Sequence, residues 1–164
     1  MSKDLENFFN RQFDEHNKVA SDCQKKIQSS FLNVIKICIR SLKRKKKILF
    51  FGNGGSASDA QHLATELTVR FSKNRKAIPA ISLATDTSAL TAIGNDFGFD
   101  FIFSRQIEAL GDKDDVAIGI TTSGKSNNVI NAIKTAKKKG LKCVVFTGNY
   151  TRLVSSLCDE IISI

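Results

Sequence analysis

Two hydrophobic patterns divide this chain. From about Leu5 to Leu42, apolar residues recur at intervals of three and four, which predicts one long amphipathic helix. Beyond it, short runs of Ile, Leu, Val and Phe without polar alternation are typical of strands buried on both faces. These runs predict strands over 48–51, 80–83, 116–120, 142–147 and 158–164, separated by helical patterns over about 56–71, 87–93, 100–110 and 126–138.

Strands that alternate with helices predict an α/β fold, because parallel strands are joined by crossovers that place helices on the faces of the sheet. We expect a three-layer α/β/α sandwich with a five-stranded parallel sheet and a long N-terminal helix. The 164 residues suit a single domain, 1–164, with a helical segment over 1–45 and an α/β core over 46–164. The apolar stripe of the first helix needs a partner surface.

Composition narrows the class of protein. Hydrophobic residues make up 41% of the chain and charged residues 25%, as in soluble globular proteins. No apolar run approaches the roughly 20 residues that span a bilayer, and the start of the chain lacks a signal-peptide pattern. We therefore expect a cytoplasmic protein with no membrane partner. The four cysteines are dispersed, which favours reduced thiols over disulfides or a thiolate metal site.

The formal charge of +9 leaves two interpretations open. A polyanion could bind the basic runs over 43–47 and 137–139. Those runs lie at predicted helix ends, however, where cations complement the helix dipole. We favour attraction of a phosphorylated small molecule over specific nucleic-acid binding.

A glycine-rich turn follows the first predicted strand. The segment Gly52–Ser56, with the sequence GNGGS, breaks an apolar run and leads directly into a helical pattern. Such a turn directs free backbone N–H groups toward one point, where an anion or polar ligand can sit. Its sequence differs from the dinucleotide fingerprint, so we expect no nucleotide cofactor.

A second glycine-bearing turn follows the strand over 116–120. The segment Thr121–Ser126 supplies four hydroxyls ahead of a predicted helix, and hydroxyls together with the amides of a helix start can hold a phosphate. The alternative is ordinary helix capping by Ser123 or Ser126. The turn is not a Walker motif, because Ile120 stands where the first glycine of that motif would be.

His62 and Glu66 are four residues apart, so they share one face of the helix that follows the first turn, and we place them about one turn inside its N-terminus. They are metal ligands, an acid/base pair, or a surface pair with nothing between them. Two residues do not hold zinc alone, because three or four ligands are needed. Asn95 and Asp96 add polar groups that turn chemistry also explains.

A series of motifs runs nearly continuously from about residue 48 to 150. It comprises Gly52-Asn53-Gly54-Gly55-Ser56 with Asp59-Ala60, His62, Glu66-Leu67-Thr68 and Arg70, then Asn74-Arg75, Pro79-Ala80-Ile81, Gly94-Asn95-Asp96-Phe97-Gly98-Phe99, Ile102-Phe103-Ser104-Arg105, and Thr122-Ser123-Gly124 with Ser126. In this order the motifs resemble the phosphoheptose isomerases of the SIS (sugar isomerase) domain family. The long N-terminal helix is similar to the one that helps to build a homotetramer in that family, which would make residues 1–45 an oligomerisation segment.

The resemblance implies an aldose–ketose isomerase that converts sedoheptulose 7-phosphate to D-glycero-D-manno-heptose 7-phosphate, the first step toward the heptose of bacterial lipopolysaccharide. Glu66 would be the catalytic carboxylate that moves the proton. The substrate would contact Asn53, Gly54, Gly55, Glu66, Asn95, Asp96, Thr121, Thr122, Ser123 and Ser126. His62 and Glu66 match two ligands of the zinc ion found in some members.

The sequence departs from the family in three ways. Thr121 and Lys125 stand where a serine and an asparagine are usual. The family also continues beyond the position of Ile164 into a helix with a glutamine and a histidine, the remaining zinc ligands and the partner acid/base. We expect the chain as given to lack that helix, on which catalytic competence depends.

Two other functions stay open. One is a non-catalytic SIS-domain tetramer that binds a protein partner such as the replication initiator DnaA, and the other is a sugar-phosphate-sensing regulatory domain. The presence of Glu66 together with His62 favours the enzyme.

Overall fold

The computed structural model describes residues 2–164, with side chains from Lys3 onward, so the predicted domain start at residue 1 lies outside the described residues. Its elements are α1 (Ser2–Lys43), β1 (Ile48–Gly52), α2 (Gly55–Thr68), β2 (Ala80–Ser82), α3 (Thr87–Asp96), the 3-10 helix η1 (Phe99–Phe101), α4 (Ser104–Leu110), β3 (Val116–Thr121), α5 (Asn127–Lys138), β4 (Lys142–Thr147) and β5 (Glu160–Ser163).

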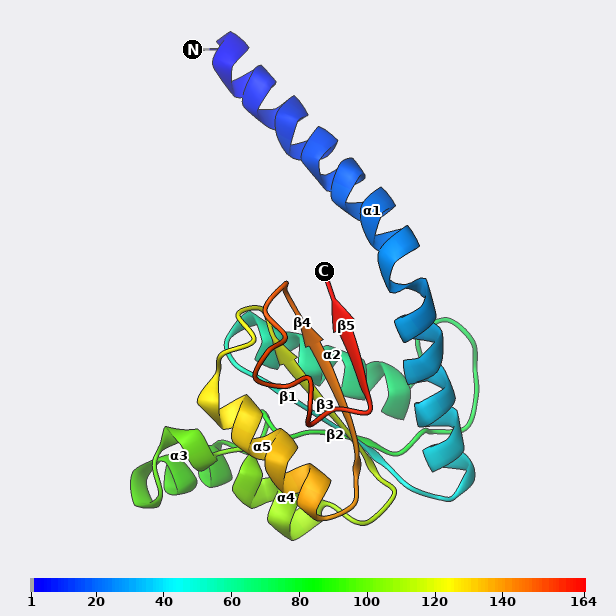
Figure 1. Ribbon diagram of the computed structural model, residues 1–164, viewed down its shortest axis with the longest axis vertical. Helices are drawn as coiled ribbons and strands as arrows, with labels where there is room; N and C mark the ends of the chain where they lie inside the picture. Colours follow the sequence, from blue (N-terminus) through cyan, green and yellow to red (C-terminus); the bar gives the residue numbers. More distant parts are fainter. Residues whose placement is uncertain (1) are drawn as a thin grey trace.

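The strands form one five-stranded sheet in the order β2-β1-β3-β4-β5, and every pairing is parallel. Helices α1 and α2 cover one face, whereas α4 and α5 cover the other (Figure 1). Alternate residues of a strand face opposite layers. Phe50 packs in the same cluster as Ala60 of α2, whereas Leu49 and Phe51 pack in the cluster that contains Ile107 of α4. The predicted three-layer α/β/α sandwich is confirmed.

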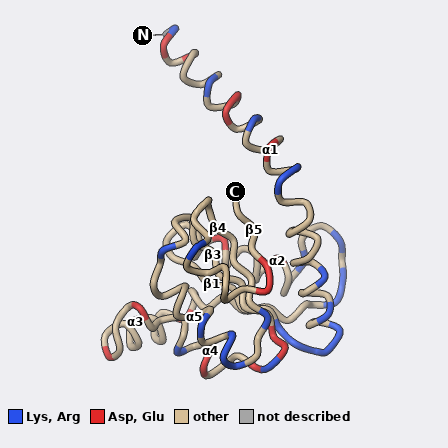
Figure 2. Tube along the Cα trace, viewed as in Figure 1, with Lys and Arg blue, Asp and Glu red and all other residues tan. Residues whose placement is uncertain are grey.

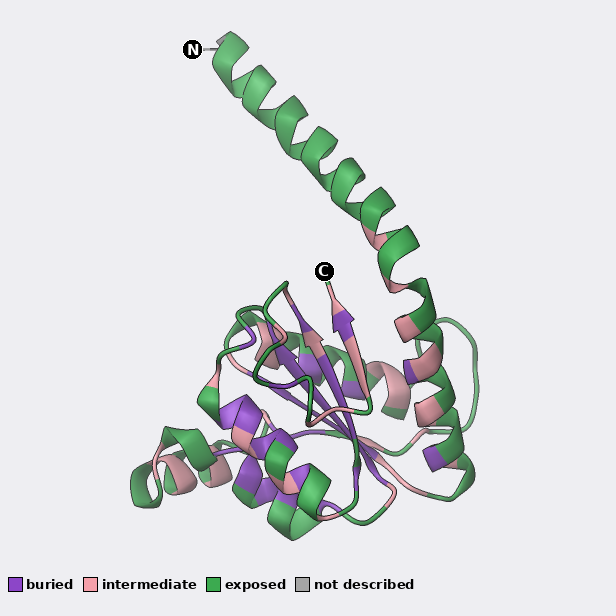
Figure 3. Ribbon diagram, in the orientation of Figure 1, coloured by how far each residue is buried: buried purple, intermediate pink, exposed green. Residues whose placement is uncertain are grey.

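Helix α1 is 42 residues long, and only its C-terminal part packs on the sheet. Residues 3–22 are exposed throughout, and this stretch projects away from the rest of the molecule (Figure 3). Val34 is buried, and the Asn33 side chain donates a hydrogen bond to Glu160 Oε2 at 2.9 Å. The described helices include none that is long and apolar enough to cross a membrane.

Most element boundaries lie close to the predicted ones. Helix α3 continues to Asp96, beyond the predicted end at residue 93, and the helix predicted over 100–110 is two elements, η1 and α4. The end of α2 also differs. This helix ends at Thr68, before the predicted end at residue 71. The guanidinium of Arg75 donates hydrogen bonds to the backbone oxygens of Glu66 at 2.6 Å and Leu67 at 2.8 Å. A side chain from the following loop therefore satisfies carbonyls that a longer helix would have paired internally.

Candidate active site

Two polar turns leave the sheet at the same edge, side by side. Gly52 at the end of β1 pairs with Ile120 of β3, so the turns that begin at Asn53 and Thr121 follow adjacent strand ends. Ligands of parallel α/β sheets bind at this carboxyl edge. The two glycine-bearing turns therefore lie next to each other at one edge of the sheet.

The first turn is tightly packed on one side and open on the other. A Cβ atom on Gly52 would lie 2.7 Å from the backbone oxygen of Ile120 and 2.7 Å from Ser56 Cβ, so only glycine fits there. A Cβ atom on Gly54 or Gly55 would meet nothing within 4 Å. The backbone of this turn therefore borders open space at the N-terminus of α2, where the helix dipole favours an anion.

The hydroxyl groups of Thr121 and Ser126 face each other across the second turn, with Oγ1 and Oγ 3.2 Å apart. Ser126 is the N-cap residue of α5, but its side chain makes no capping hydrogen bond. Ser123 Oγ accepts a hydrogen bond from the N–H of Lys125 at 3.2 Å, within the turn itself. These contacts do not support the capping alternative, and they leave hydroxyls lining the start of α5.

Lys125, one of the two unusual residues of this turn, is exposed, as is Thr122. The Lys125 ammonium nitrogen lies 4.7 Å from the ring centroid of Tyr150, which is a cation–π distance. Gly124 has a φ of 63°, and a Cβ atom there would clash with the backbone of Tyr150. The segment around Tyr150 thus packs closely against the second turn and positions its cation.

Asn128 joins the two turns, and sequence reasoning missed it. Its side chain is buried and exchanges two hydrogen bonds with the Asn53 amide, at 2.9 and 2.8 Å. The partners are 75 positions apart, so no local pattern connects them. The only signal in the sequence was an amide side chain in the first turn of a predicted helix, directly after the hydroxyl-rich turn.

His62 and Glu66 contact each other, with Nε2 and Oε1 3.2 Å apart and with side chains 71% and 31% exposed. They lie far along α2 from the turns. Glu66 is 11 residues beyond Gly55, the start of α2, so the 1.5 Å rise per residue places it about 16 Å along the helix. The next turn of the helix reaches the opposite edge of the sheet, where Thr68 Oγ1 donates to the backbone oxygen of Ala80 at 3.3 Å.

This placement corrects one expectation. The His62–Glu66 pair lies two to three turns inside the helix rather than one, because the two residues follow Gly55, the start of α2, by 7 and 11 positions and a helical turn takes only 3.6 residues. Within one copy of the chain, the turns flank the N-terminal end of α2 and the carboxylate lies toward its C-terminal end, near the amino ends of β1 and β2 (Figure 1).

Asn95 and Asp96 also lie apart from the two turns. They end helix α3, both are exposed, and Asn95 Nδ2 donates to Asp96 Oδ1 at 2.8 Å. Helix α3 itself begins directly after Asp86, whose carboxylate accepts the N–H of Ala89 at 3.0 Å as an N-cap. It stands at the margin of the molecule, at the lower left of Figure 1.

Among the described residues, no group of three or more His, Cys, Asp and Glu side chains is arranged to hold a metal ion. His62 and Glu66 offer two donors, whereas a zinc site takes three or four. The side chains of a single copy therefore do not fit a complete zinc site.

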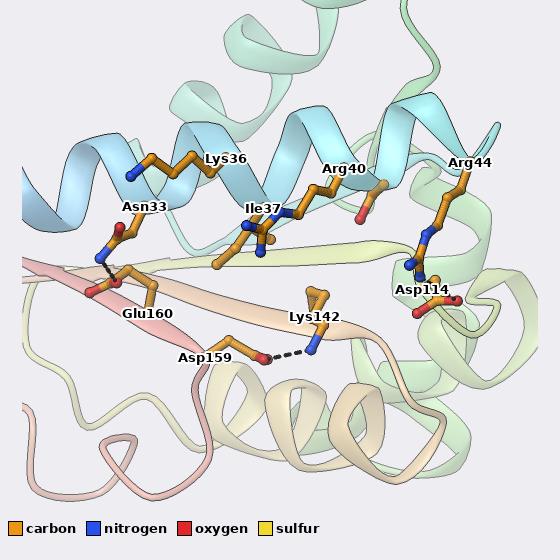
Figure 4. Close-up of a pocket in the computed structure, with 10 residues that line it drawn as sticks. Asn33, Lys36, Ile37, Arg40, Arg44, Asp114, Lys142, Asp159 and Glu160 are labelled. Carbon is orange, nitrogen blue, oxygen red and sulfur yellow. Dashed lines mark hydrogen bonds and ion pairs between the residues drawn. The ribbon is translucent and has the colours of Figure 1, made fainter.

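A separate groove of about 640 Å³ lies between α1 and the starts of β4 and β5 (Figure 4). Lys and Arg are frequent along this end of α1 and in the loop after α2 (Figure 2). Several charges in the groove pair with one another, as Lys142 does with Asp159 at 2.9 Å and Arg44 with Asp114 at 3.4 Å. The groove lies at the amino edge of the sheet, whereas the ligands of parallel α/β sheets bind at the carboxyl edge, where the two turns lie.

Known proteins share this sequence and fold. The SIS domain family matches residues 12–148. A phosphoheptose isomerase from a Nitratiruptor species is 49% identical over 148 residues, which is 90% of this chain and 79% of that protein. The solved structure of phosphoheptose isomerase GmhA from Neisseria gonorrhoeae gives a TM-score of 0.89 at 38% identity, covering 97% of this chain and 85% of that one. A phosphoheptose isomerase from Francisella tularensis gives 0.92 at 30% identity, covering 96% and 84%. The chain therefore belongs to the phosphoheptose isomerases of the SIS domain family.

Proposed function

We propose that this protein isomerises sedoheptulose 7-phosphate to D-glycero-D-manno-heptose 7-phosphate, a precursor of bacterial surface heptose. The observation that carries the proposal is the pair of turns at the carboxyl edge of the sheet, where the Thr121 and Ser126 hydroxyls face each other beside the buried Asn53–Asn128 amide pair. Membership of the phosphoheptose isomerases supplies the substrate and the reaction.

The second turn would hold the phosphate. Hydroxyl groups of Thr121, Thr122, Ser123 and Ser126 donate hydrogen bonds, and the N-terminus of α5 adds backbone N–H groups and a favourable dipole. A dianion can be bound in this way without a metal ion. The first turn would then contact the sugar through Asn53 and the backbone of Gly54 and Gly55, which borders open space.

The reaction needs a base rather than a redox cofactor. A carboxylate removes the proton from C1 of the ketose, the electrons form an enediolate, and the proton returns at C2 as the O1 hydroxyl proton passes to O2. We assign the base to Glu66, and substrate contacts on the sugar to Asn95 and Asp96. Polar groups that steady the enediolate lower the barrier further.

The position of Glu66 supports a site shared between copies of the chain. In one copy its carboxylate lies about 16 Å along α2 from the start of that helix, which is farther than one sugar phosphate extends. We propose that the protein is a homotetramer in the cytoplasm, in which Glu66 of one copy faces the turns of another. The exposed apolar side chains of α1, such as Phe9 and Phe13, would be covered in this assembly.

The proposed reaction steps do not use a zinc ion. Imidazole and carboxylate are suitable zinc ligands, so His62 and Glu66 could contribute two donors to a site completed by other residues. A carboxylate held by zinc is a poorer base than a free one, and we give Glu66 the role of base.

The alternative function, a non-catalytic tetramer that binds a protein such as DnaA, is not favoured. The chain keeps both the carboxylate and the turns, and its similarity is to phosphoheptose isomerases across most of its length.

The proposal is tested by incubating the protein with sedoheptulose 7-phosphate and following the aldose product. Glu66→Gln should lower kcat by about a hundredfold or more, because general acid/base groups contribute factors of this size, while substrate affinity by calorimetry is kept. Glu108→Gln, an exposed glutamate on α4, is the matched control and should retain turnover. If the native protein neither turns over nor binds sedoheptulose 7-phosphate, the proposed function is wrong. If Glu66→Gln is as active as the native protein, the base is elsewhere.

A further inference from the structure

Asn128 is buried with 2% of its surface exposed, although its side chain is an amide that needs hydrogen-bond partners. It lies in the first turn of α5, two residues after Ser126, and faces the end of β1. Asn53 Nδ2 donates to Asn128 Oδ1 at 2.9 Å, and Asn128 Nδ2 donates to Asn53 Oδ1 at 2.8 Å. The two amides therefore form a closed pair that ties the first turn to the second.

A third contact fixes the orientation of the two amide groups, that is, which atom of each is the oxygen and which is the nitrogen. The backbone N–H of Val129 donates to Asn128 Oδ1 at 2.9 Å. A backbone N–H can only donate, so the Asn128 atom that faces it must be the carbonyl oxygen and not the nitrogen. The orientation of Asn128 then sets that of Asn53, whose Oδ1 must face the Asn128 nitrogen.

The hydrogen-bond count leaves Asn53 with one free donor. Its Nδ2 carries two hydrogens, and one of them is used by Asn128 Oδ1. Asn53 is only partly buried and adjoins Gly54 and Gly55, over which there is open space. The remaining N–H is thus available to a ligand at the carboxyl edge.

We propose that Asn128 is a positioning residue, which holds the Asn53 amide so that it presents an N–H donor to an oxygen of the bound sugar phosphate. Without Asn128, the Asn53 amide can rotate and present its carbonyl oxygen instead. A carbonyl oxygen cannot donate a hydrogen bond to an acceptor such as the ketone oxygen of the sugar. The inference rests on the proposed function for the identity of the substrate. It concerns a residue that the motifs of the family did not single out.

A double-mutant cycle tests this role. Asn128→Ala should lower kcat/KM for sedoheptulose 7-phosphate about tenfold, the value of one well-placed hydrogen bond. In an Asn53→Ala background the same substitution should change kcat/KM less than about twofold, because the amide it positions is gone. Asn127→Ala, an exposed amide in the same helix turn whose described partner is Asp100, is the matched control and should leave kcat/KM unchanged.

A role of Asn128 that does not act through Asn53 predicts a different outcome, namely that Asn128→Ala lowers kcat/KM equally in both backgrounds, and this would overturn the proposal. Should Asn128→Ala fail to fold, Asn128→Ser replaces it, since a serine hydroxyl can still accept from Val129 N–H but cannot reach Asn53 as the amide does. If the native protein shows no turnover, the cycle is run on the calorimetric Kd of the same sugar phosphate, and the absence of both turnover and binding counts against the proposed function. The same non-additive pattern in Kd supports the positioning role, and additive losses overturn it.

Discussion

At the scale of single residues, Asp115 is a buried carboxylate that no pattern in the sequence predicted. Its side chain is fully buried, one residue before β3. Its carboxylate accepts hydrogen bonds from the backbone N–H groups of Lys47 at 3.0 Å and Asp112 at 2.8 Å, and it pairs with Lys47 Nζ at 2.6 Å. The network connects the segment before β1 to the segment before β3 and so helps to align the two strands that carry the site.

Removing Lys47 should destabilise the fold. Lys47→Met leaves the buried Asp115 carboxylate with two backbone donors but no cation, so we expect the free energy of unfolding to fall by about 3 kcal/mol. Denaturant unfolding measures the change. Lys43→Met, which removes an exposed lysine at the end of α1, should change it little. Equal losses of unfolding free energy in the two variants would show that the Lys47–Asp115 pair does not stabilise the fold more than an exposed lysine does.

The same pair gives a pH dependence. Burial lowers the pKa of Lys47, but hydrogen bonds to Asp115 and Asp112, together with their charges, outweigh it, so the pKa lies above its ordinary value of 10.5. A lysine whose pKa is higher in the folded state than in the unfolded state stabilises the fold. This contribution is fully present at a pH below the pKa of the unfolded state, and it is lost as the pH rises through the pKa of the folded state. The difference between the native protein and Lys47→Met should therefore shrink above about pH 10.5.

At the scale of elements, α1 has an apolar face that nothing covers within one copy of the chain, among the described residues. Its N-terminal stretch is amphipathic, yet Phe8, Phe9 and Phe13 are each more than half exposed, at 53%, 59% and 55%. An isolated helix of this kind gains little stability from propensity alone, so its apolar face is expected to be covered by another copy.

Charges on the apolar face of α1 should break the proposed assembly. Phe9→Glu together with Phe13→Glu should convert the oligomer to smaller species in light scattering after size-exclusion chromatography, because two carboxylates would be buried without partners. Ser21→Glu with Ser29→Glu adds the same charge at exposed polar positions of the same helix and should leave the mass unchanged. An unchanged mass for the phenylalanine variant would place the interface elsewhere.

At the scale of the whole molecule, the turns and the glutamate lie at opposite ends of α2, so the proposed site would depend on assembly. A complementation experiment follows. Glu66→Gln and Thr121→Val/Ser126→Ala are coexpressed with different tags, and mixed oligomers are purified through both tags. In a closed homo-oligomer, random mixing gives about a quarter of the shared sites an intact glutamate and intact hydroxyls. Activity near that fraction is expected, and no gain over the two parent variants would place both groups in one copy.

The sequence by itself determined the layers and the turns. Apolar runs without alternation and the periodicity of three and four are local signals, so the order of strands and helices, and the glycines at Gly52 and Gly124 where the chain must turn tightly, could be predicted from them. The hydroxyls of the second turn were found for the same reason, since they follow directly after a strand.

Only the tertiary structure decided which of these groups meet. The Asn53–Asn128 amide pair and the Lys47–Asp115 ion pair join residues far apart in the chain, and the order β2-β1-β3-β4-β5 brings them together. The placement of Glu66 depends on the direction of α2 along the sheet, which a spacing of four residues does not contain. Periodicity fixes the face on which a side chain lies, whereas the packing of one element on another fixes what that face meets.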